Sequence, residues 1–465
     1  MNKPEPDRED EQEHAADAAE SEASEDTAAE QADGPGEAET ETPETDKPSD
    51  PEIPPAKRPS FVSAFVQNLT TANTVMVTIF SFVLAMVIGA LLIIASDGEV
   101  RRTFGYFFAR PTDALEASWG AVSEVYAGLF AGSIVNFESV RSLLSGEGTW
   151  AQVLRPISET MTYSAPLILA GLAVGLAFRA GLFNIGAQGQ VIMGAVGGAV
   201  VGFAFHLPVA VHLPLALLGG LIAGALFGAV PGVLKATTGT HEVITSIMLN
   251  YVALFGLLWI INVSWIKDPD PAKNYDVSKP VDESAMLPRL FGDISPLLRA
   301  NAGIIVAIVV AVFVAWVLSK TTFGYRMRAV GLNPDASRAA GMSVPRTYAS
   351  SMAGAGSLAG LAGAVIVLSI PPNALTGGVA GEVGFDGITV ALLGRAKPVG
   401  IIGAGLLFGA LRAGAQSMQS VIPLDMVTIL QALIVIFIAA PALVKAILRL
   451  KTPAGGLTVS VAKGW

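Results

Sequence analysis

The sequence predicts an all-α, polytopic membrane protein with about ten transmembrane helices, some of them broken or re-entrant. Of the 465 residues, 52% are hydrophobic and only 15% are charged, whereas soluble proteins carry about 25% charged residues. The mean hydropathy is +0.56. Polar residues interrupt one membrane-grade stretch, residues 171–205, at Arg179, Asn184, Gln188 and Gln190. Polar or irregular chain at membrane depth needs protein or a water-filled cavity around it, so we expect a path through a bilayer.

Residues 1–60 are expected to form a disordered, acidic, cytoplasmic tail. Residues 1–52 hold 20 acidic residues against 3 basic ones, a net charge of −17, which leaves +7 for residues 53–465. Large apolar residues are scarce in this segment, so burial cannot offset the entropy of ordering. We interpret the tail as a solvating extension, with a docking or electrostatic arm as the alternative. It lacks the basic start and short apolar core of a cleavable signal peptide.

Windows of about 20 apolar residues place the spans in order along the chain. They fall near residues 74–95, 158–178, 184–205, 211–234, 243–263, 301–319, 349–370, 386–394, 399–420 and 424–445. Small-residue runs such as 353–363 are expected to let these helices approach closely.

The distribution of Lys and Arg predicts the orientation. With the amino terminus inside, the inward loops carry Lys57, Arg58, Arg179, Lys235, Lys320, Arg326, Arg328, Arg338, Arg346, Arg395, Lys397, Lys445, Arg449 and Lys451. The longest outward loop, 264–299, mixes both signs and has no basic excess. Both termini are therefore expected to be cytoplasmic, with residues 451–465 as the carboxy-terminal tail.

The segment 97–154 is long and only moderately apolar, with several aromatic residues near its start. Aromatic rings favour the headgroup zone, so we expect an interfacial amphipathic helix plus a loop on the outer face. An extra half-span is the alternative.

The largest inward loop, residues 320–348, contains the signals of a short surface helix at about 334–340. Asn333 is a good N-cap, Pro334 suits the first helical position, Asp335 faces the positive helix end, and Gly341 supplies a left-handed stop. One interpretation is a compact connector. The other is a coupling helix seated in a groove of a cytoplasmic motor subunit, where Arg326, Arg328 and Arg338 pair with acidic partners. The sequence alone leaves both open.

Four polar residues are candidates for the translocation path: Asn184, Gln188, Asn250 and Asp386. Each can hydrogen-bond a polar solute. The alternative, favoured for any single Asn or Gln, is a link between helices worth about 0.6–2 kcal/mol. For Asp386 we expect a structural role as the cap of a helix that begins at Gly387.

Two similar strings end in basic residues, GLAVGLAFRA at 171–180 and GITVALLGRA at 387–396. They match at five of ten positions, a weak indication of an internal repeat. Arg179 and Arg395 are expected to extend to the inner interface as topology anchors.

The residues argue against an enzyme. Cys is absent, and His14, His206, His212 and His241 lack metal-ligand spacing, so neither a metal nor a catalytic residue is expected. No HExxH, GxSxG or phosphate-loop motif occurs, and no nucleic-acid partner is indicated. An ion-coupled secondary transporter would need acidic residues inside the spans, and only Glu159 and Asp386 lie near span ends.

Four long strings carry a family resemblance: GLAVGLAFRAGLFNIGAQGQ at 171–190, HEVITSIMLNY at 241–251, TTFGYRMRAVGLNPDASRAAGMSV at 321–344 and GFDGITVALLGRAKPVGIIGAGLLFGALRAGA at 384–415. The chain resembles the permease subunits of bacterial ABC importers in the branched-chain amino acid and simple sugar group, most closely those linked to nucleoside uptake. It departs from them at His241, where the family more often has Asn, and in its acidic tail.

The resemblance implies that residues 61–450 are a transmembrane permease domain of an importer in the cell membrane. It implies a separate ABC ATPase that binds ATP and Mg²⁺, a second homologous permease and an extracytoplasmic substrate-binding lipoprotein. The expected contact with the ATPase then involves Arg326, Arg328, Gly331, Asn333, Pro334, Asp335, Arg338 and Gly341. Nucleosides are the first expected solutes, simple sugars the second and branched-chain amino acids the third.

Overall fold

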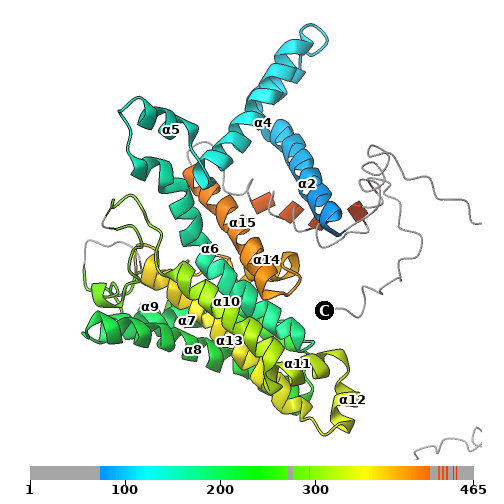
Figure 1. The fold of residues 1–465 in the computed structure, drawn as a ribbon, viewed down its shortest axis with the longest axis vertical. Coiled ribbons are helices and arrows are strands. Elements are labelled where there is room, and N and C mark those ends of the chain that lie inside the picture. The colour runs from blue at the N-terminus through cyan, green and yellow to red at the C-terminus, as the bar shows by residue number, and fades with distance from the viewer. Residues whose placement is uncertain are drawn as a thin grey trace, which may run out of the picture. The chain divides into compact units, whose positions relative to one another are not determined.

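The computed structural model describes residues 74–270, 276–292 and 294–418, with short helical pieces between 428 and 447. Regular structure in these ranges is helical, with isolated β-bridges only. The elements are α2 Thr74–Ser96, α3 Gly98–Phe104, α4 Pro111–Ser133, α5 Phe137–Leu144, α6 Trp150–Arg179, α7 Ala187–Ala204, α8 Val209–Thr238, α9 Glu242–Ile261, η1 Glu283–Ala285, α10 Gly303–Lys320, α11 Thr322–Leu332, α12 Pro334–Ala339, α13 Val344–Ser369, α14 Val383–Leu393 and α15 Pro398–Ser417 (Figure 1). The expected tails, 1–60 and 451–465, lie outside the described residues.

The predicted all-α membrane fold is confirmed. Within the described ranges, seven helices are long and apolar enough to cross a membrane: α6, α7, α8, α9, α10, α13 and α15. The pair α2 and α3, bent by 79°, brings the number to eight if it counts as one span. The expected span at 386–394 is the shorter apolar helix α14. Most of the last expected span, 424–445, lies outside the described residues.

The spans differ sharply in burial. The most apolar window of α6 is 89% buried and that of α13 is 83% buried, whereas those of α8 and α9 are each 22% buried. The exposed residues of the outer helices include Leu226, Phe255 and Trp259. Exposed side chains of this kind suit contact with lipid. The polar residues that interrupt residues 171–205 thus belong to the centre of the bundle.

Glycines set the distance between the central helices. A Cβ added to Gly224 of α8 would lie 2.3 Å from the carbonyl oxygen of Gly356 and 2.5 Å from Cα of Gly360 in α13. A Cβ on Gly194 of α7 would lie 2.2 Å from Cα of that same Gly360. Small residues therefore allow direct backbone contact, as expected for the run 353–363.

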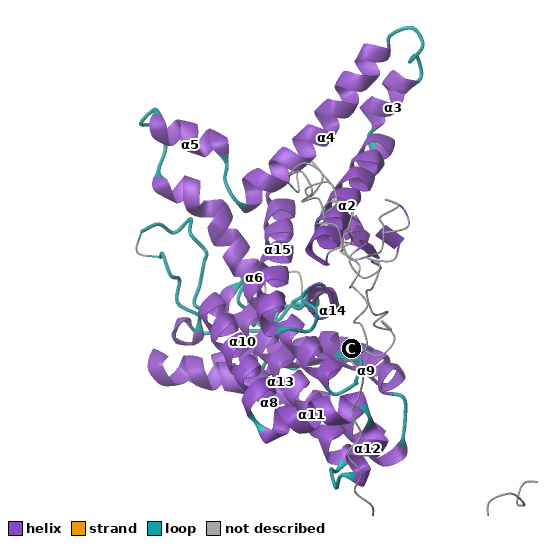
Figure 2. Cartoon of the chain, turned by 45° about the vertical axis from the view of Figure 1, so that its right-hand side comes forward, coloured by secondary structure: helices purple, strands orange, loops and turns teal. Residues whose placement is uncertain are grey.

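The expectation of one interfacial helix and a loop at 97–154 is wrong, because this segment holds the helices α3, α4 and α5 and the beginning of α6 (Figure 2). Asp97 caps α3 by accepting from the backbone N–H groups of Glu99 and Val100, at 2.8 and 2.9 Å. Asn136 caps α5 in the same way. Between them, α4 has 23 residues, but it is not one of the helices apolar enough to cross a membrane. Its Gly128 and Gly132 lie against the end of α15, which explains why a helix packs here.

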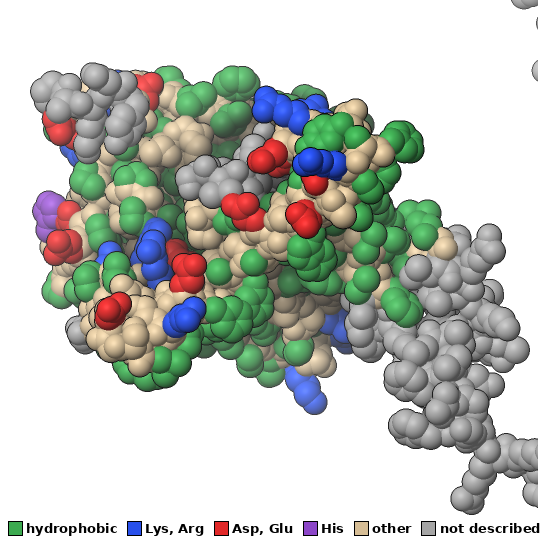
Figure 3. All heavy atoms as spheres, turned by 90° about the horizontal axis from the view of Figure 1, so that it is seen from above, with side chains coloured by type: hydrophobic (Ala, Val, Ile, Leu, Met, Phe, Trp, Pro, Cys, Tyr) green, Lys and Arg blue, Asp and Glu red, His purple; other side chains and the backbone are tan. Residues whose placement is uncertain are grey.

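The loop between α9 and α10 packs against the beginning of α6. The backbone N–H of Ala300 donates to Oγ of Ser158 at 2.7 Å, and Arg299 pairs with Glu159 at 3.3 Å. This end of the bundle, near α5, lies opposite the end that carries α12 (Figure 1). Seen from above, it presents acidic and basic side chains among hydrophobic ones (Figure 3).

Candidate functional site

The centre of the site is the break between α6 and α7, residues 180–186, here called the α6–α7 break. Helix α6 ends at Arg179, and Gly181 has a φ of +72°, a left-handed conformation that suits glycine. Backbone bonds from Gly181 to Phe178 and from Leu182 to Ala177, both 3.1 Å, close the end of α6. The polar interruption in the sequence is therefore a real break in the helix.

Asn184 lies in this break and is completely buried. Its Nδ2 donates to Oε1 of Gln190 at 2.8 Å, and Nε2 of Gln190 donates back to its Oδ1 at 3.0 Å. Gln190, which interrupts the apolar stretch, was not among the predicted path residues. The two amides satisfy each other and hold the break against the first turn of α7.

Gln188 and Asn250 link the break to other helices. Nε2 of Gln188 donates to the carbonyl of Gly381 at 2.6 Å, and its Oε1 accepts from the N–H of Gly384 at 2.9 Å. Asn250 of α9 accepts from the N–H of Gly189 at 2.8 Å and donates to the carbonyl of Ile185 at 3.0 Å. These bonds agree with the helix-linking interpretation, and contact with a solute stays a prediction.

Asp386 does not cap a helix at Gly387, so that prediction is wrong. Helix α14 begins earlier, at Val383, because Gln188 receives the free N–H of Gly384 in its first turn. Asp386 instead pairs with Arg412 of α15 at 3.3 Å, with both side chains less than a third exposed. Arg412 was missed, although a basic residue inside the apolar run 398–417 is a signal of such a partner.

The predicted surface helix is confirmed as α12. Oδ1 of Asn333 accepts from the N–H groups of Asp335 and Ala336 at 3.1 and 3.0 Å, and Gly341 has a φ of +80°. Arg338 is exposed and pairs with Asp335 within the helix at 3.1 Å.

Helix α11 precedes α12 and was not expected. Its first turn is closed by Oγ1 of Thr321, which accepts from the N–H of Gly324 at 3.1 Å. Three predicted coupling residues lie on it: Arg326, which is exposed, Arg328, which is partly buried, and Gly331. Together α11 and α12 form a basic surface, here called the α11–α12 surface.

Gly331 joins this surface to the α6–α7 break. A Cβ at Gly331 would lie 2.5 Å from the carbonyl oxygen of Arg179 and 2.9 Å from the nitrogen of Gly181. Only a residue without a side chain fits this approach. The predicted coupling residue is thus in direct backbone contact with the centre of the site.

Arg179 is partly buried and is held by the backbone of a distant turn, while its expected place at the inner interface stays a prediction. Its Nε and Nη2 donate to the carbonyl of Ala396 at 3.1 and 2.9 Å, in the turn after α14. Arg395 and Ala396 have left-handed φ values of 54° and 49°, which turn this carbonyl toward the guanidinium. The two similar strings of the sequence therefore pack against each other, with Gly171 beside Val390.

A further polar cluster at the α12 end was not recognised in the sequence. Lys235, near the end of α8, pairs with the buried Glu242 at the start of α9. Nζ of Lys235 also lies 5.5 Å from the ring centroid of Tyr348 in α13. His241, the N-cap residue of α9, makes no capping bond with its side chain. Three helices are thus tied together next to α12.

Comparison with known families matches residues 157–439 to the family described as the branched-chain amino acid transport system permease component. The chain belongs to this permease family. Its relatives include the guanosine ABC transporter permease protein NupP of Bacillus subtilis, 42% identical over 68% of this chain and 91% of the relative. The nucleoside ABC transporter permease protein NupB of Lactococcus lactis is 38% identical over 63% and 82%. The glucose ABC transporter permease protein TsgB13 of Haloferax volcanii is 34% identical over 61% and 75%.

No solved structure matches the permease. The family assignment confirms the expected membrane subunit of an ABC transporter, which is not itself an enzyme. The matched range contains the α6–α7 break, the α11–α12 surface and the Asp386–Arg412 pair, so the site lies within the part that defines the family.

Proposed function

We propose that this permease forms the translocation path of an ATP-driven importer of nucleosides. The observation that carries the proposal is the likeness to two nucleoside-type permeases over 91% and 82% of their lengths. Simple sugars are the second candidate, supported by the glucose permease at 34% identity. Branched-chain amino acids are the third and rest on the family description alone.

The driving force reaches the permease at the α11–α12 surface. A separate ABC ATPase, holding ATP and Mg²⁺, would seat α12 in a groove and pair acidic residues with Arg326 and Arg338. Because Gly331 touches the backbone of Arg179, movement of α11 displaces the α6–α7 break. The amide links of Asn184, Gln188 and Asn250 then carry the displacement to α7, α14 and α9.

The orientation follows from the charges. The α12 end carries Lys235, Lys320, Arg326, Arg338 and Arg346, which supports a cytoplasmic position for this end and is the ground for proposing that both termini lie inside. The α5 end then faces outward, toward an extracytoplasmic binding lipoprotein.

Because the chain has no Cys, a single Cys introduced at Asn333 reports on which side of the membrane this residue lies. A membrane-impermeant maleimide should label Asn333→Cys in inverted vesicles and not in intact cells; the reverse pattern contradicts this orientation.

A second, different permease subunit completes the path. Two permease proteins of Bacillus subtilis match this chain, NupP at 42% and NupQ at 29% identity. Lactococcus lactis repeats the pattern, with NupB at 38% and NupC at 28%. In each organism the two relatives differ in their sequence identity to this chain. This supports a heteromeric pair in which this chain corresponds to NupP and NupB, the more similar relatives, and a second permease corresponds to NupQ and NupC.

Uptake of radiolabelled guanosine and uridine in a strain lacking this chain tests whether nucleosides are the imported solutes. Loss of uptake, restored by the wild-type gene, is expected. Glucose and leucine uptake measured in the same cells are the controls. Unchanged nucleoside uptake with loss of glucose or leucine uptake would replace the nucleoside assignment by the second or third candidate.

A further inference from the structure

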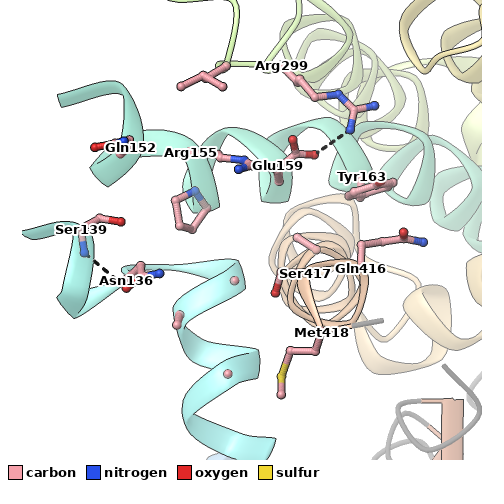
Figure 4. Close-up of a pocket in the computed structure, with 16 residues that line it drawn as sticks. Asn136, Ser139, Gln152, Arg155, Glu159, Tyr163, Arg299, Gln416, Ser417 and Met418 are labelled. Atoms are coloured by element: carbon pink, nitrogen blue, oxygen red, sulfur yellow. Dashed lines mark hydrogen bonds and ion pairs between the residues drawn. The ribbon is translucent and has the colours of Figure 1, made fainter. Parts of the chain in front are cut away.

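A cavity of about 810 Å³ lies between α4, α5, α6 and α15 (Figure 4). These helices meet at the end of the bundle opposite α12 (Figure 1). The size of the cavity falls in the range of small-molecule sites, about 300–1,000 Å³. None of the predicted path residues lines it. Its polar side chains come from segments far apart in the sequence and include Asn136, Gln152, Arg155, Glu159, Arg299 and Gln416.

The lining combines donors and acceptors. Oε2 of Glu159 pairs with Nη1 of Arg299 at 3.3 Å, and the Glu159 side chain is 14% exposed. Arg155 adds a second guanidinium, and Gln152 and Gln416 add side-chain amides, of which Oε1 of Gln152 also accepts from the backbone N–H of Thr149 at 3.0 Å. The Tyr163 ring lies among them (Figure 4). Groups of this kind can bind hydroxyls through the carboxylate and the heteroatoms of a base through the amides, while the ring offers a stacking face.

The same lining is poorly suited to a branched aliphatic side chain. Leu297, Met418 and Pro156 are its larger apolar side chains, and the rest of its apolar lining is Ala or Gly. Burying an aliphatic group among charged and amide groups would desolvate them without replacing their hydrogen bonds. The cavity thus favours a polar solute over a branched-chain amino acid.

Polar groups continue from the cavity to the α6–α7 break. Gln416 and Arg412 are four residues apart in α15 and so share one face of the helix. Arg412 pairs with Asp386, and a Cβ on Gly381 would lie 2.8 Å from Nη2 of Arg412. The carbonyl of Gly381 accepts from Gln188, whose first-turn position in α7 adjoins the break. A hydrophilic column thus leads from the cavity toward the centre of the bundle.

We propose that this cavity is an outer solute-binding site of the permease, here called the binding station. Its solute is neutral, carries several hydroxyl groups and contains a planar base. Glu159 accepts hydrogen bonds from the ribose hydroxyls, and the ring of Tyr163 stacks on the base. This inference rests on the proposed nucleoside import and on the orientation with α5 outside.

The absence of Cys allows a direct test by labelling. Ser139 lines the cavity, whereas Ser145, just after the same helix α5, is exposed and does not line it. Each serine is changed to cysteine in the full transporter complex in proteoliposomes, and labelling by a charged thiol reagent is followed with guanosine, ribose or leucine present. Guanosine should slow the labelling of Ser139→Cys and leave Ser145→Cys unchanged, while leucine should protect neither.

A second pair of variants tests the same site by the kinetics of guanosine uptake. Glu159→Gln should raise the KM for guanosine uptake about tenfold, as expected for one lost charged hydrogen bond, with little change in the maximal ATPase rate. Glu138→Gln, exposed on α5 and outside the cavity, should behave as wild type.

The outcomes separate the two proposals. If wild type imports guanosine but guanosine protects neither cysteine and Glu159→Gln keeps the wild-type KM, the binding station is wrong and nucleoside import stands. If Ser139→Cys is not labelled even without solute, the cavity is closed and the station is likewise overturned. If wild type imports leucine and not guanosine, and leucine protects Ser139→Cys, both the import proposal and the solute class are overturned.

Discussion

Gly331 of α11 lies directly against the carbonyl oxygen of Arg179, where a Cβ would come within 2.5 Å. The contact is between two backbones, which cannot yield as a flexible side chain would. It joins the α11–α12 surface to the α6–α7 break without an intervening residue. A displacement of α11 must therefore move the end of α6 or break this contact.

Gly331→Ala should separate ATP hydrolysis from transport. The added methyl overpacks a tight contact, at a cost of about 1–3 kcal/mol, and pushes the α6–α7 break away from α11. In proteoliposomes with the complete transporter, solute uptake per ATP hydrolysed should fall severalfold while the protein stays in the membrane. Gly256→Ala is the matched control, because a Cβ at Gly256 of α9 meets nothing within 4 Å. Equal coupling in both variants would show that the contact transmits no force.

Arg338→Glu should also impair coupling, but at the surface of the permease. The Arg338 side chain is 66% exposed, and its pair with Asp335 is worth about 0.2–1 kcal/mol at most, so folding should be retained. If α12 seats in an acidic groove of the ATPase as proposed, the reversed charge is repelled there, so the affinity for the ATPase should fall with a strong dependence on ionic strength. Binding of the detergent-solubilised permease to the ATPase at two salt concentrations measures this. Arg338→Lys keeps the charge and should bind normally; normal binding by Arg338→Glu would make α12 a passive connector.

The sequence was sufficient to predict those structural features that depend on residues within a single segment. Spans are defined by continuous apolar windows, so α7 to α10 and α15 could be placed within four residues, whereas α13 begins five residues and α6 eight residues before the expected start. Helix α12 could be predicted because Asn333, Pro334 and Gly341 act on the backbone of the same short segment. Helices α3 and α5 depend on similar caps, Asp97 and Asn136, which went unrecognised because the surrounding segment looked only moderately apolar.

The sequence was insufficient to predict contacts that arise from packing between segments far apart in the chain. Arg179 faces the carbonyl of Ala396 because of left-handed turns at Arg395 and Ala396, conformations that those residue types do not favour on their own. Asp386 meets Arg412 only because α14 and α15 fold back on each other. The polar cavity likewise exists only where α4, α5, α6 and α15 converge.

The Asn184–Gln190 pair should show strong thermodynamic coupling. Either Asn184→Ala or Gln190→Ala leaves the other amide buried without its partner, at a cost of about 1–3 kcal/mol. The double variant should cost less than the sum, with a coupling energy of about 0.5–3 kcal/mol. Thermal unfolding of the purified permease in detergent, measured for all four proteins of the cycle, gives this value. Additive losses would mean that the two reciprocal bonds of 2.8 and 3.0 Å contribute nothing as a pair.

The Asp386–Arg412 pair should prove dispensable for stability but not for uptake. Arg412→Met alone leaves the mostly buried Asp386 carboxylate without its cationic partner and should destabilise the permease by about 3–5 kcal/mol. Adding Asp386→Leu removes that charge, so the double variant should regain most of the stability. Because this pair lies in the polar column below the cavity, guanosine uptake by the double variant should remain low even when thermal unfolding is normal. If uptake recovers together with stability, Asp386 is a structural residue only and leaves the set of predicted path residues, and the column from Gln416 to Gln188 is then not a route for the solute.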